Sequence, residues 1–326
     1  MTALGPYRTP EARSGDLRAL AERAGGTVVG YGQSVQGRAL ELACLPGPPG
    51  APRLLLSANL HGIEVIGAHV ALAWLEAAGT PGTPAHALRE RAELWVLPCL
   101  NPDGYARTFD AGGHGRLAEL RTNANGVDLN RNYPLPTGRP TRRLPGAGSA
   151  RPGDATYRGP SPLSEPETAA LAALCEAERF VASANLHSTM GTLIPARVTD
   201  RASYATYRAL CRSFRRAQPD WRYFRLASRL FDVFTGEQED FQHHALGCWS
   251  VCVEVFPILA SLRQHLRAPS LFWRFNPRVP DRWIRNDLPG VAAYFTHALS
   301  LPDRRTELVS SSPPTRPSLP CAGGAP

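Results

Sequence analysis

Short apolar runs alternate with segments of helical periodicity along most of this chain. The run Leu54-Leu55-Leu56 is typical of a buried strand, and apolar residues recur at helical spacing directly after it, between Val65 and Leu75. A second run, Leu94-Trp95-Val96-Leu97, leads into Asn101-Pro102-Asp103-Gly104, whose residue types favour a turn. Strands that alternate with helices predict an α/β fold, with a mixed, largely parallel central sheet and helices on both faces.

The same reasoning places the remaining elements. Further strands are expected at residues 27–31, 39–44, 180–187 and 248–256, and helices at residues 16–24, 88–91, 202–216 and 289–299. Ser164-Glu165-Pro166-Glu167 matches a capping box with Ser164 as the N-cap, and Pro289 fits the first turn of the last helix. We predict a lead-in at residues 1–24, one folded domain at 25–302 and a disordered tail at 303–326, which has little apolar content.

The composition fits one large folded domain. The chain has 326 residues and 43% of them are hydrophobic, which is enough to bury a substantial core. All 36 basic residues are arginine and the formal net charge is +8. The arginines are dispersed and no nucleic-acid-binding motif accompanies them, so we expect no nucleic-acid partner. The longest apolar stretch, residues 65–79, is too short to cross a bilayer, so we expect no membrane association. The sequence does not indicate an oligomeric state.

Cysteine usage and the first residues bear on the compartment. The seven cysteines are odd in number and lack tight spacing, which favours a reducing environment over a disulfide framework. Residues 1–15 contain no apolar core, so we expect no signal peptide. Together these features predict a cytoplasmic protein.

A repeated pentapeptide carries the first candidate chemistry. Ser57-Ala58-Asn59-Leu60-His61 and Ser183-Ala184-Asn185-Leu186-His187 are identical in sequence, and each follows an apolar run. Each histidine would lie at the carboxyl end of a strand, where open α/β sheets place their sites. Glu64 is three residues beyond His61, so on a helix the two side chains would share a face. Two imidazoles and a carboxylate suit a catalytic zinc ion, although either histidine alone could be a satisfied core residue.

A carboxylate inside an apolar strand is the second candidate. In the predicted strand at 248–256, Val251, Val253 and Val255 share one face, and Cys252 and Glu254 share the other. Burial of a carboxylate is costly unless the group is paired or functional. We therefore interpret Glu254 as functional; a buried structural ion pair is the alternative.

The segment 121–134 is polar and contains two arginines, four asparagines and one aspartate. A guanidinium group suits a carboxylate or an oxyanion, because its fork of donors matches two oxygen atoms. By itself, however, the segment fits an ordinary polar loop better.

Taken in order, these residues resemble the zinc carboxypeptidase family, the group of the pancreatic carboxypeptidases A and B and their bacterial relatives. The resemblance covers roughly residues 25–300, which would be a zinc carboxypeptidase-like catalytic domain. Its motifs are His61-x-x-Glu64, Asn101-Pro102-Asp103-Gly104, Gly126-Val127-Asp128-Leu129-Asn130-Arg131-Asn132, Tyr157-Arg158-Gly159-Pro160, Ser164-Glu165-Pro166-Glu167, His187-Ser188 and Glu254.

The resemblance implies a role for each functional group. One zinc ion per chain would be held by His61, Glu64 and His187. Glu254 would act as the general base that takes a proton from water and passes it to the leaving amine.

Four further roles are implied by the same motifs. Arg121 would stabilise the oxyanion, and Asn130 and Arg131 would bind the terminal carboxylate of the substrate. Asp128 would hydrogen-bond a zinc-ligating histidine.

The segment ahead of Glu254 bears on specificity. Asp240 matches a family aspartate, but the position eight residues before it, a tyrosine in the pancreatic enzymes, is Asp232. The residue just before the matched aspartate lines the pocket for the leaving side chain in the family, and here it is Glu239. An acid there favours a basic leaving residue. Alternatively, Glu239 lies on a solvated turn and pairs with an arginine.

The activity that the resemblance implies is that of a zinc metallocarboxypeptidase, which hydrolyses the C-terminal amide bond of a peptide or peptide-like substrate with a free carboxylate. An amidase that cleaves γ-D-glutamyl-diaminopimelate bonds of murein peptides, or a deacylase of small N-acyl amino acids, would use the same groups. A non-catalytic binding module is disfavoured, because the predicted zinc ligands and Glu254 are all present.

Overall fold

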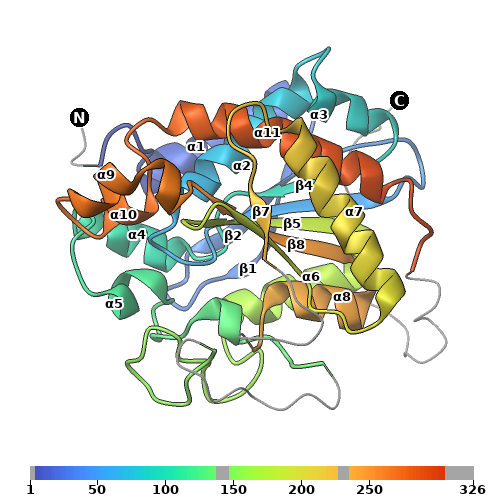
Figure 1. The fold of residues 1–326 in the computed structure, drawn as a ribbon. Coiled ribbons are helices and arrows are strands. Elements are labelled where there is room, and N and C mark those ends of the chain that lie inside the picture. Colours follow the sequence, from blue (N-terminus) through green and yellow to red (C-terminus); the bar gives the residue numbers. More distant parts are fainter. Residues whose placement is uncertain (1–3, 137–146, 227–234, 305–326) are drawn as a thin grey trace.

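The computed structural model describes residues 4–136, 147–226 and 235–304, and these form an α/β fold around one twisted sheet (Figure 1). Eight strands make up the sheet in the order β1-β2-β4-β3-β5-β8-β6-β7. Their bounds are β1 Thr27–Gln33, β2 Ala39–Leu45, β3 Arg53–Ala58, β4 Glu93–Leu97, β5 Ala182–Ser188, β6 Thr192–Pro195, β7 Phe224–Arg225 and β8 Trp249–Val255. The predicted fold class, a mixed and largely parallel sheet, is confirmed.

The four central strands, β4, β3, β5 and β8, are parallel to one another. Antiparallel pairs occur toward the edges, where β1 pairs with β2, β2 with β4, and β6 with β8. Every residue of β5 is buried, as expected for a central parallel strand covered on both faces.

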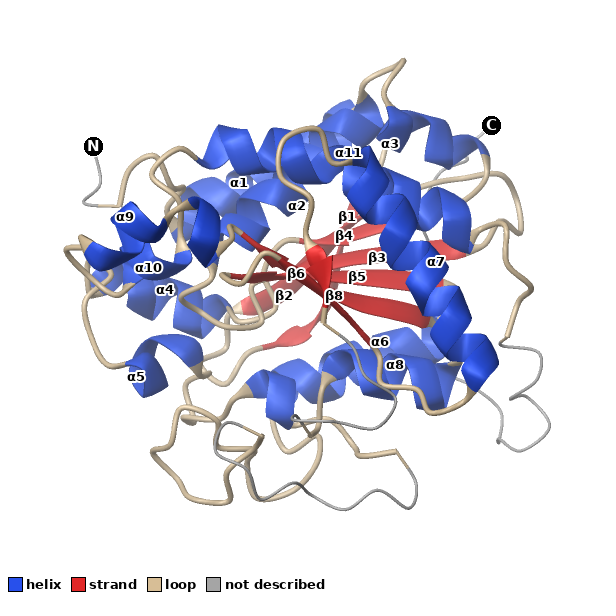
Figure 2. Cartoon of the chain, in the orientation of Figure 1, coloured by secondary structure: helices blue, strands red, loops and turns tan. Residues whose placement is uncertain are grey.

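Helices cover both faces of the sheet (Figure 2). Along the chain they are α1 Pro10–Arg23, α2 Val65–Gly79, α3 Pro84–Ala87, η1 Leu88–Glu90, α4 Pro102–Asp110, α5 Leu117–Arg121, η2 Leu129–Arg131, α6 Pro166–Glu178, α7 Arg201–Ala217, α8 Gln238–Leu246, η3 Ile258–Ala260, α9 Leu262–Leu266, α10 Phe272–Phe275 and α11 Pro280–Ala298. One core joins α1, α2, α7 and α11 to Leu54 and Leu56, and a second core joins α6 and α8 to Leu55. Neighbouring residues of β3 therefore serve opposite faces, as the strand period requires.

Several predicted element boundaries were wrong. Asn101 caps α4 and accepts a hydrogen bond from the Gly104 amide at 2.8 Å, so its motif begins a helix and is not a turn. The N-cap of α6 is Glu165, and Ser164 lies one residue earlier. The last helix begins at Pro280, nine residues before the predicted start at Pro289, which lies inside the helix. Both prolines give the same N-terminal signal in the sequence.

The ends of the chain bear on the predicted domain limits. Helix α1 contributes Leu17, Leu20 and Ala21 to the same core as α2, although residues 1–24 were predicted as a lead-in. Residues 305–326, most of the predicted disordered tail, lie outside the described residues. The limits of the catalytic domain therefore stay a prediction. Among the described helices, none is long and apolar enough to cross a membrane.

Candidate metal centre and active site

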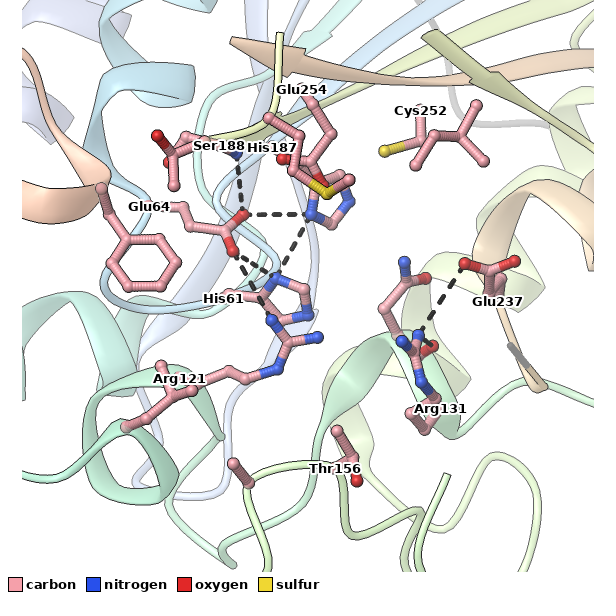
Figure 3. A pocket seen from close by; sticks show the side chains of 17 residues that line it. His61, Glu64, Arg121, Arg131, Thr156, His187, Ser188, Glu237, Cys252 and Glu254 are labelled. Atoms are coloured by element: carbon pink, nitrogen blue, oxygen red, sulfur yellow. Dashed lines mark hydrogen bonds and ion pairs between the residues drawn. The ribbon is translucent and has the colours of Figure 1, made fainter. Parts of the chain in front are cut away.

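The carboxyl ends of three adjacent strands bring the candidate groups together. His61 follows β3, and His187 is the sixth residue of β5, the strand that pairs with β3 in parallel. Strand β8 lies on the other side of β5, and its Glu254 is the register partner of His187. The three side chains open into one cavity (Figure 3).

Glu64 reaches the site from a turn and not from a helix. It is the N-cap of α2, and its amide donates to the carbonyl of His61 at 3.0 Å. The prediction that His61 and Glu64 share a helical face is therefore wrong, although the turn still brings the two side chains into contact. Gly62 makes this turn possible, because a Cβ atom there would lie 2.4 Å from the backbone of Gly104.

The donor atoms of three buried side chains converge. His61 Nδ1 lies 2.8 Å from Glu64 Oε1, and His187 Nδ1 lies 3.1 Å from Glu64 Oε2 and 3.2 Å from His61 Nδ1. Zinc–ligand distances of about 2.0–2.1 Å in a tetrahedral site place the ligand atoms roughly 3.3–3.4 Å apart. The observed spacing is close to this value, so two imidazoles and one carboxylate fit a zinc ion with one position left open.

Asp128 contacts both His61 and the neighbouring guanidinium group of Arg121. Its Oδ1 lies 3.1 Å from His61 Nε2, and its Oδ2 accepts from Arg121 Nε at 2.9 Å. Burial alone would raise the pKa of Asp128, but the charges of Arg121 and His61 outweigh it and lower the pKa well below its usual range. The carboxylate thus stays ionised and orients His61, as carboxylates do beside metal-ligating histidines.

Glu64 is kept ionised in a similar way. Burial would raise the pKa of its carboxyl group, and the charges and hydrogen bonds of His61 and His187 lower it further than burial raises it. The Ser188 amide also donates to Glu64 Oε2 at 3.2 Å. The sequence did not predict this donor, because a backbone amide does not depend on the type of residue.

Glu254 differs from these carboxylates. It is half-buried, and its Oε2 has no hydrogen-bond partner among the described residues. Burial, together with the nearby Glu64 carboxylate, raises the pKa of Glu254 to about 7. A carboxylate with such a pKa can accept and return a proton near neutral pH.

The cavity has a volume of about 280 Å³ and continues from the metal centre toward two further polar groups. Asn130 and Arg131, both in η2, line its wall, and Asn130 Oδ1 accepts from the Gln238 amide at 2.9 Å. Arg131 is buried, and one of its terminal nitrogens lies 3.8 Å from Glu237. Arg121 lines the same cavity nearer the metal centre.

Glu239 is placed differently from the other predicted site residues. It is 2% exposed, and its Oε1 accepts from the Asn185 amide group at 2.8 Å, so the alternative of a solvated turn is wrong. Glu239 is not in the cavity wall, whereas Glu237, two residues earlier, is. Asp232, which stands where the pancreatic enzymes have a tyrosine, lies outside the described residues.

Comparison with known families decides the assignment. Residues 16–258 match the sequence model of the family described as zinc carboxypeptidase. The chain belongs to the zinc carboxypeptidase family. Members of this family are zinc-dependent hydrolases of peptide bonds, and the donor set described above offers such an ion its ligands.

Individual relatives agree with the family assignment. Carboxypeptidase D of Drosophila melanogaster is 34% identical over 172 residues, which cover 50% of this chain and only 11% of that protein. The chain also resembles bovine thrombin-activatable fibrinolysis inhibitor, solved in complex with tick carboxypeptidase inhibitor, at 17% identity and a TM-score of 0.70, covering 93% of this chain and 98% of that one. A metallo-carboxypeptidase from Pseudomonas aeruginosa, in complex with (2-guanidinoethylmercapto)succinic acid, is 22% identical with a TM-score of 0.55, covering 86% and 68%. These two structures share the fold.

Proposed function

We propose that this chain is a zinc-dependent carboxypeptidase that removes a C-terminal residue from peptides. One observation carries the proposal: a convergent set of two histidines and a glutamate, the carboxylate of Glu254 and the buried guanidinium group of Arg131 share a single cavity. Family membership and the short distances among His61, Glu64 and His187 support a metal centre, the pKa of Glu254, about 7, supports a base, and the charge of Arg131 supports binding of a carboxylate.

Substrate binding would begin at Arg131 and Asn130. A guanidinium group in a buried cavity binds a carboxylate through two parallel hydrogen bonds, and this selects a free C-terminus. The capping of η2 by Asp128 and the contact between Asn130 and the Gln238 amide hold both side chains in place. The scissile carbonyl group would then lie between this end of the cavity and the metal centre.

The chemical step would rest on Glu254 and Arg121. A zinc ion held by His61, Glu64 and His187 would polarise the scissile carbonyl and lower the pKa of a water molecule. The carboxylate of Glu254 would take the proton of the attacking water and deliver it to the leaving amine. Arg121, kept in place by Asp128, would stabilise the negative charge that develops on the carbonyl oxygen.

The leaving residue is proposed to be basic. Glu237 contributes a carboxylate to the cavity wall, and Glu239 lies buried behind the wall with its Oε2 lacking a hydrogen-bond partner among the described residues. A cationic side chain would offset the cost of the half-buried Glu237 carboxylate and the buried Glu239 carboxylate. The (2-guanidinoethylmercapto)succinic acid in complex with the Pseudomonas aeruginosa metallo-carboxypeptidase combines a guanidinium group and carboxylates.

One experiment tests the proposal against its closest alternatives. Purified protein is incubated with a mixed library of peptides, murein peptides and N-acyl amino acids, and the products are identified by mass spectrometry. Loss of single C-terminal residues, abolished by a chelator and restored by zinc, is expected. Cleavage confined to γ-glutamyl or N-acyl bonds would establish one of the two alternatives, and no cleavage at all would favour a binding module. The cytoplasmic location stays a prediction. The cysteine pattern that favoured a reducing environment does not hold for Cys44, which is disulfide-bonded in the structure.

A further inference from the structure

The start of α6 carries two buried acids that take no part in the proposed chemistry. Glu165 is the N-cap residue of this helix and Glu167 lies in its first turn, and their exposed fractions are 2% and 0%. A capping box was predicted here. In the structure, both carboxylates accept hydrogen bonds from the loop that joins α5 to η2. These contacts connect α6 to the residues around the metal centre.

Asn123 is the residue of this loop that contacts both acids. Its Nδ2 donates to Glu165 Oε2 at 2.7 Å and to Glu167 Oε2 at 3.1 Å. Its Oδ1 accepts from the amides of Asn125 at 3.1 Å and Val127 at 3.0 Å. The side chain is fully buried and uses its whole hydrogen-bonding capacity. Asn123 therefore fixes the loop to α6 and also closes the loop on itself.

The two ends of the loop are the residues that touch the metal centre. Arg121 Nε donates to Asp128 Oδ2 at 2.9 Å. Asp128 Oδ1 also lies 3.1 Å from His61 Nε2, and a terminal nitrogen of Arg121 lies 3.6 Å from Glu64 Oε1. Asn123 stands two residues after Arg121 and five before Asp128. A shift of Asn123 relative to α6 would therefore move both side chains away from the metal ligands.

A second asparagine anchors the substrate-binding residues to α6 and to the segment just before it. Asn132 directly follows Asn130 and Arg131 and is also fully buried. Its Oδ1 accepts from Thr168 Oγ1 at 2.6 Å, and its Nδ2 donates to Ser164 Oγ at 3.0 Å. The two halves of the proposed site are thus held to one helix through separate contacts.

We propose that Asn123 and Asn132 are positioning residues, each of which controls a different step of the reaction. Asn123 positions the pair that orients the metal centre and stabilises the oxyanion. Asn132 positions the pair that binds the terminal carboxylate of the substrate. The effects on hydrolysis rest on the proposed function, whereas the effect on zinc affinity rests only on the contact between Asp128 and His61.

The test compares Asn123→Asp with Asn132→Asp in the full-length protein. Each substitution keeps the size of the side chain and exchanges its donor nitrogen for an oxygen. In Asn123→Asp this oxygen faces two buried carboxylates, and in Asn132→Asp it faces the carbonyl oxygens of Arg158 and Ser161. Zinc affinity is measured by competition with a chelator, and kcat and KM are measured on one peptide at saturating zinc.

The two variants should differ in opposite ways. Asn123→Asp should weaken zinc binding and lower kcat by about 10–100-fold each, because loss of the groups that orient a metal ligand has effects of this size. Its KM should change little, since the contacts of Asn132 are retained. Asn132→Asp should raise KM by about 10-fold or more, because hydrogen bonds to a charged group are weakened. Its zinc affinity and kcat should stay unchanged.

A matched control separates positioning from a general loss of stability. Asn286 in α11 is 1% exposed, and its Nδ2 donates to Asp287 Oδ1 at 2.9 Å. Asn286→Asp therefore also places one acid against another, but Asn286 does not line the cavity. This variant should retain zinc affinity, kcat and KM. Equal changes of all three quantities in the variants of Asn123 and Asn132 would show a merely structural role and overturn the proposal.

Two partner substitutions apply if an Asp variant does not fold. Glu167→Gln removes one acceptor of Asn123, retains an oxygen for the Val35 amide, and should weaken zinc binding about 2–10-fold, the effect of one hydrogen bond. Thr168→Val removes the hydroxyl group that contacts Asn132 and should raise KM alone. Unchanged values in both would overturn the proposal. If the protein hydrolyses no peptide, the proposed function fails, and zinc affinity that falls only in Asn123→Asp would still support the anchor.

Discussion

His187 and Glu254 face each other as register partners on the neighbouring parallel strands β5 and β8. This pairing places a proposed metal ligand and a carboxylate, whose Oε2 has no hydrogen-bond partner among the described residues, on one side of the sheet, at the point where both strands end. Cys252 lies two positions before Glu254 in β8, so the strand period places both side chains on the same face of the sheet. A slip of one residue in this register would turn Glu254 to the opposite face of the sheet.

The first prediction is that His187 is needed for zinc binding itself. The purified protein should carry about one zinc ion per chain, and His187→Ala should lower this occupancy because it leaves only His61 and Glu64. Zinc is measured by mass spectrometry of the purified protein after dialysis. The matched control is His114→Ala, which removes an exposed histidine and should not change the zinc content. Full occupancy in His187→Ala would exclude this residue as a ligand.

The second prediction separates catalysis from metal binding at Glu254. Glu254→Gln keeps the shape of the side chain but removes the base, so turnover should fall by roughly 10²-fold or more, with zinc content unchanged. Steady-state kinetics and a zinc assay on the same preparation give both values. Glu176→Gln, which changes an exposed carboxylate on α6, should retain full activity. Equal turnover in Glu254→Gln and the unmodified protein would remove this residue from the mechanism.

Much of the fold and the candidate site could be predicted from local sequence. The apolar runs before His61 and His187 identify β3 and β5, and the alternation of Val251 and Val253 with Cys252 identifies the inward face of β8. These signals are local, because the period of a strand depends only on its own residues.

Other features depend on contacts between distant parts of the chain. Helical periodicity begins at Val65, and the spacing of His61 and Glu64 predicts that both lie on one helical face. The turn that is found there instead is set by the packing of Gly62 on Gly104. The inward position of Glu239 follows from the rotation of α8 against the sheet, which brings this side chain to Asn185. Periodicity within α8 does not encode such a rotation.

The third prediction concerns stability and Asp287, a buried acid in α11. Its carboxylate accepts hydrogen bonds from Gln218 at 3.0 Å, Tyr223 at 2.8 Å and Asn286 at 2.9 Å, yet burial raises its pKa from 3.8 to about 7. Between about pH 4 and 7 the unfolded chain has lost this proton and the folded protein retains it. The contribution of Asp287 to the free energy of unfolding should therefore decrease as pH rises through this window, by up to about 1.4 kcal/mol per pH unit, and become constant above pH 7.

Urea denaturation at several pH values measures this effect as a difference between variants. Relative to Asp287→Asn, the unmodified protein should lose stability from about pH 4 to 7. Asp220→Asn is the control, because the hydrogen bond from Arg282 lowers the pKa of Asp220 and its contribution is lost only at lower pH. A stability difference between the unmodified protein and Asp287→Asn that does not change with pH would show that Asp287 titrates normally.

The last prediction concerns Glu237, which lines the cavity, and Glu239, which lies behind its wall. The unmodified protein should have a higher kcat/KM for a peptide that ends in Arg than for a matched peptide that ends in Phe. Glu237→Gln should lower the value for the Arg peptide by about 10–100-fold, because a hydrogen bond to a charged group contributes about 1.5–3 kcal/mol. Glu237 lies 3.8 Å from Arg131, so an equal loss of kcat/KM with the Phe peptide would instead indicate weaker binding of the terminal carboxylate by Arg131.

Glu239→Gln retains an oxygen for Asn185 and removes only the charge, so a loss of kcat/KM that is confined to the Arg peptide would assign that buried charge to specificity. A preference for Phe that neither substitution changes would refute a basic substrate.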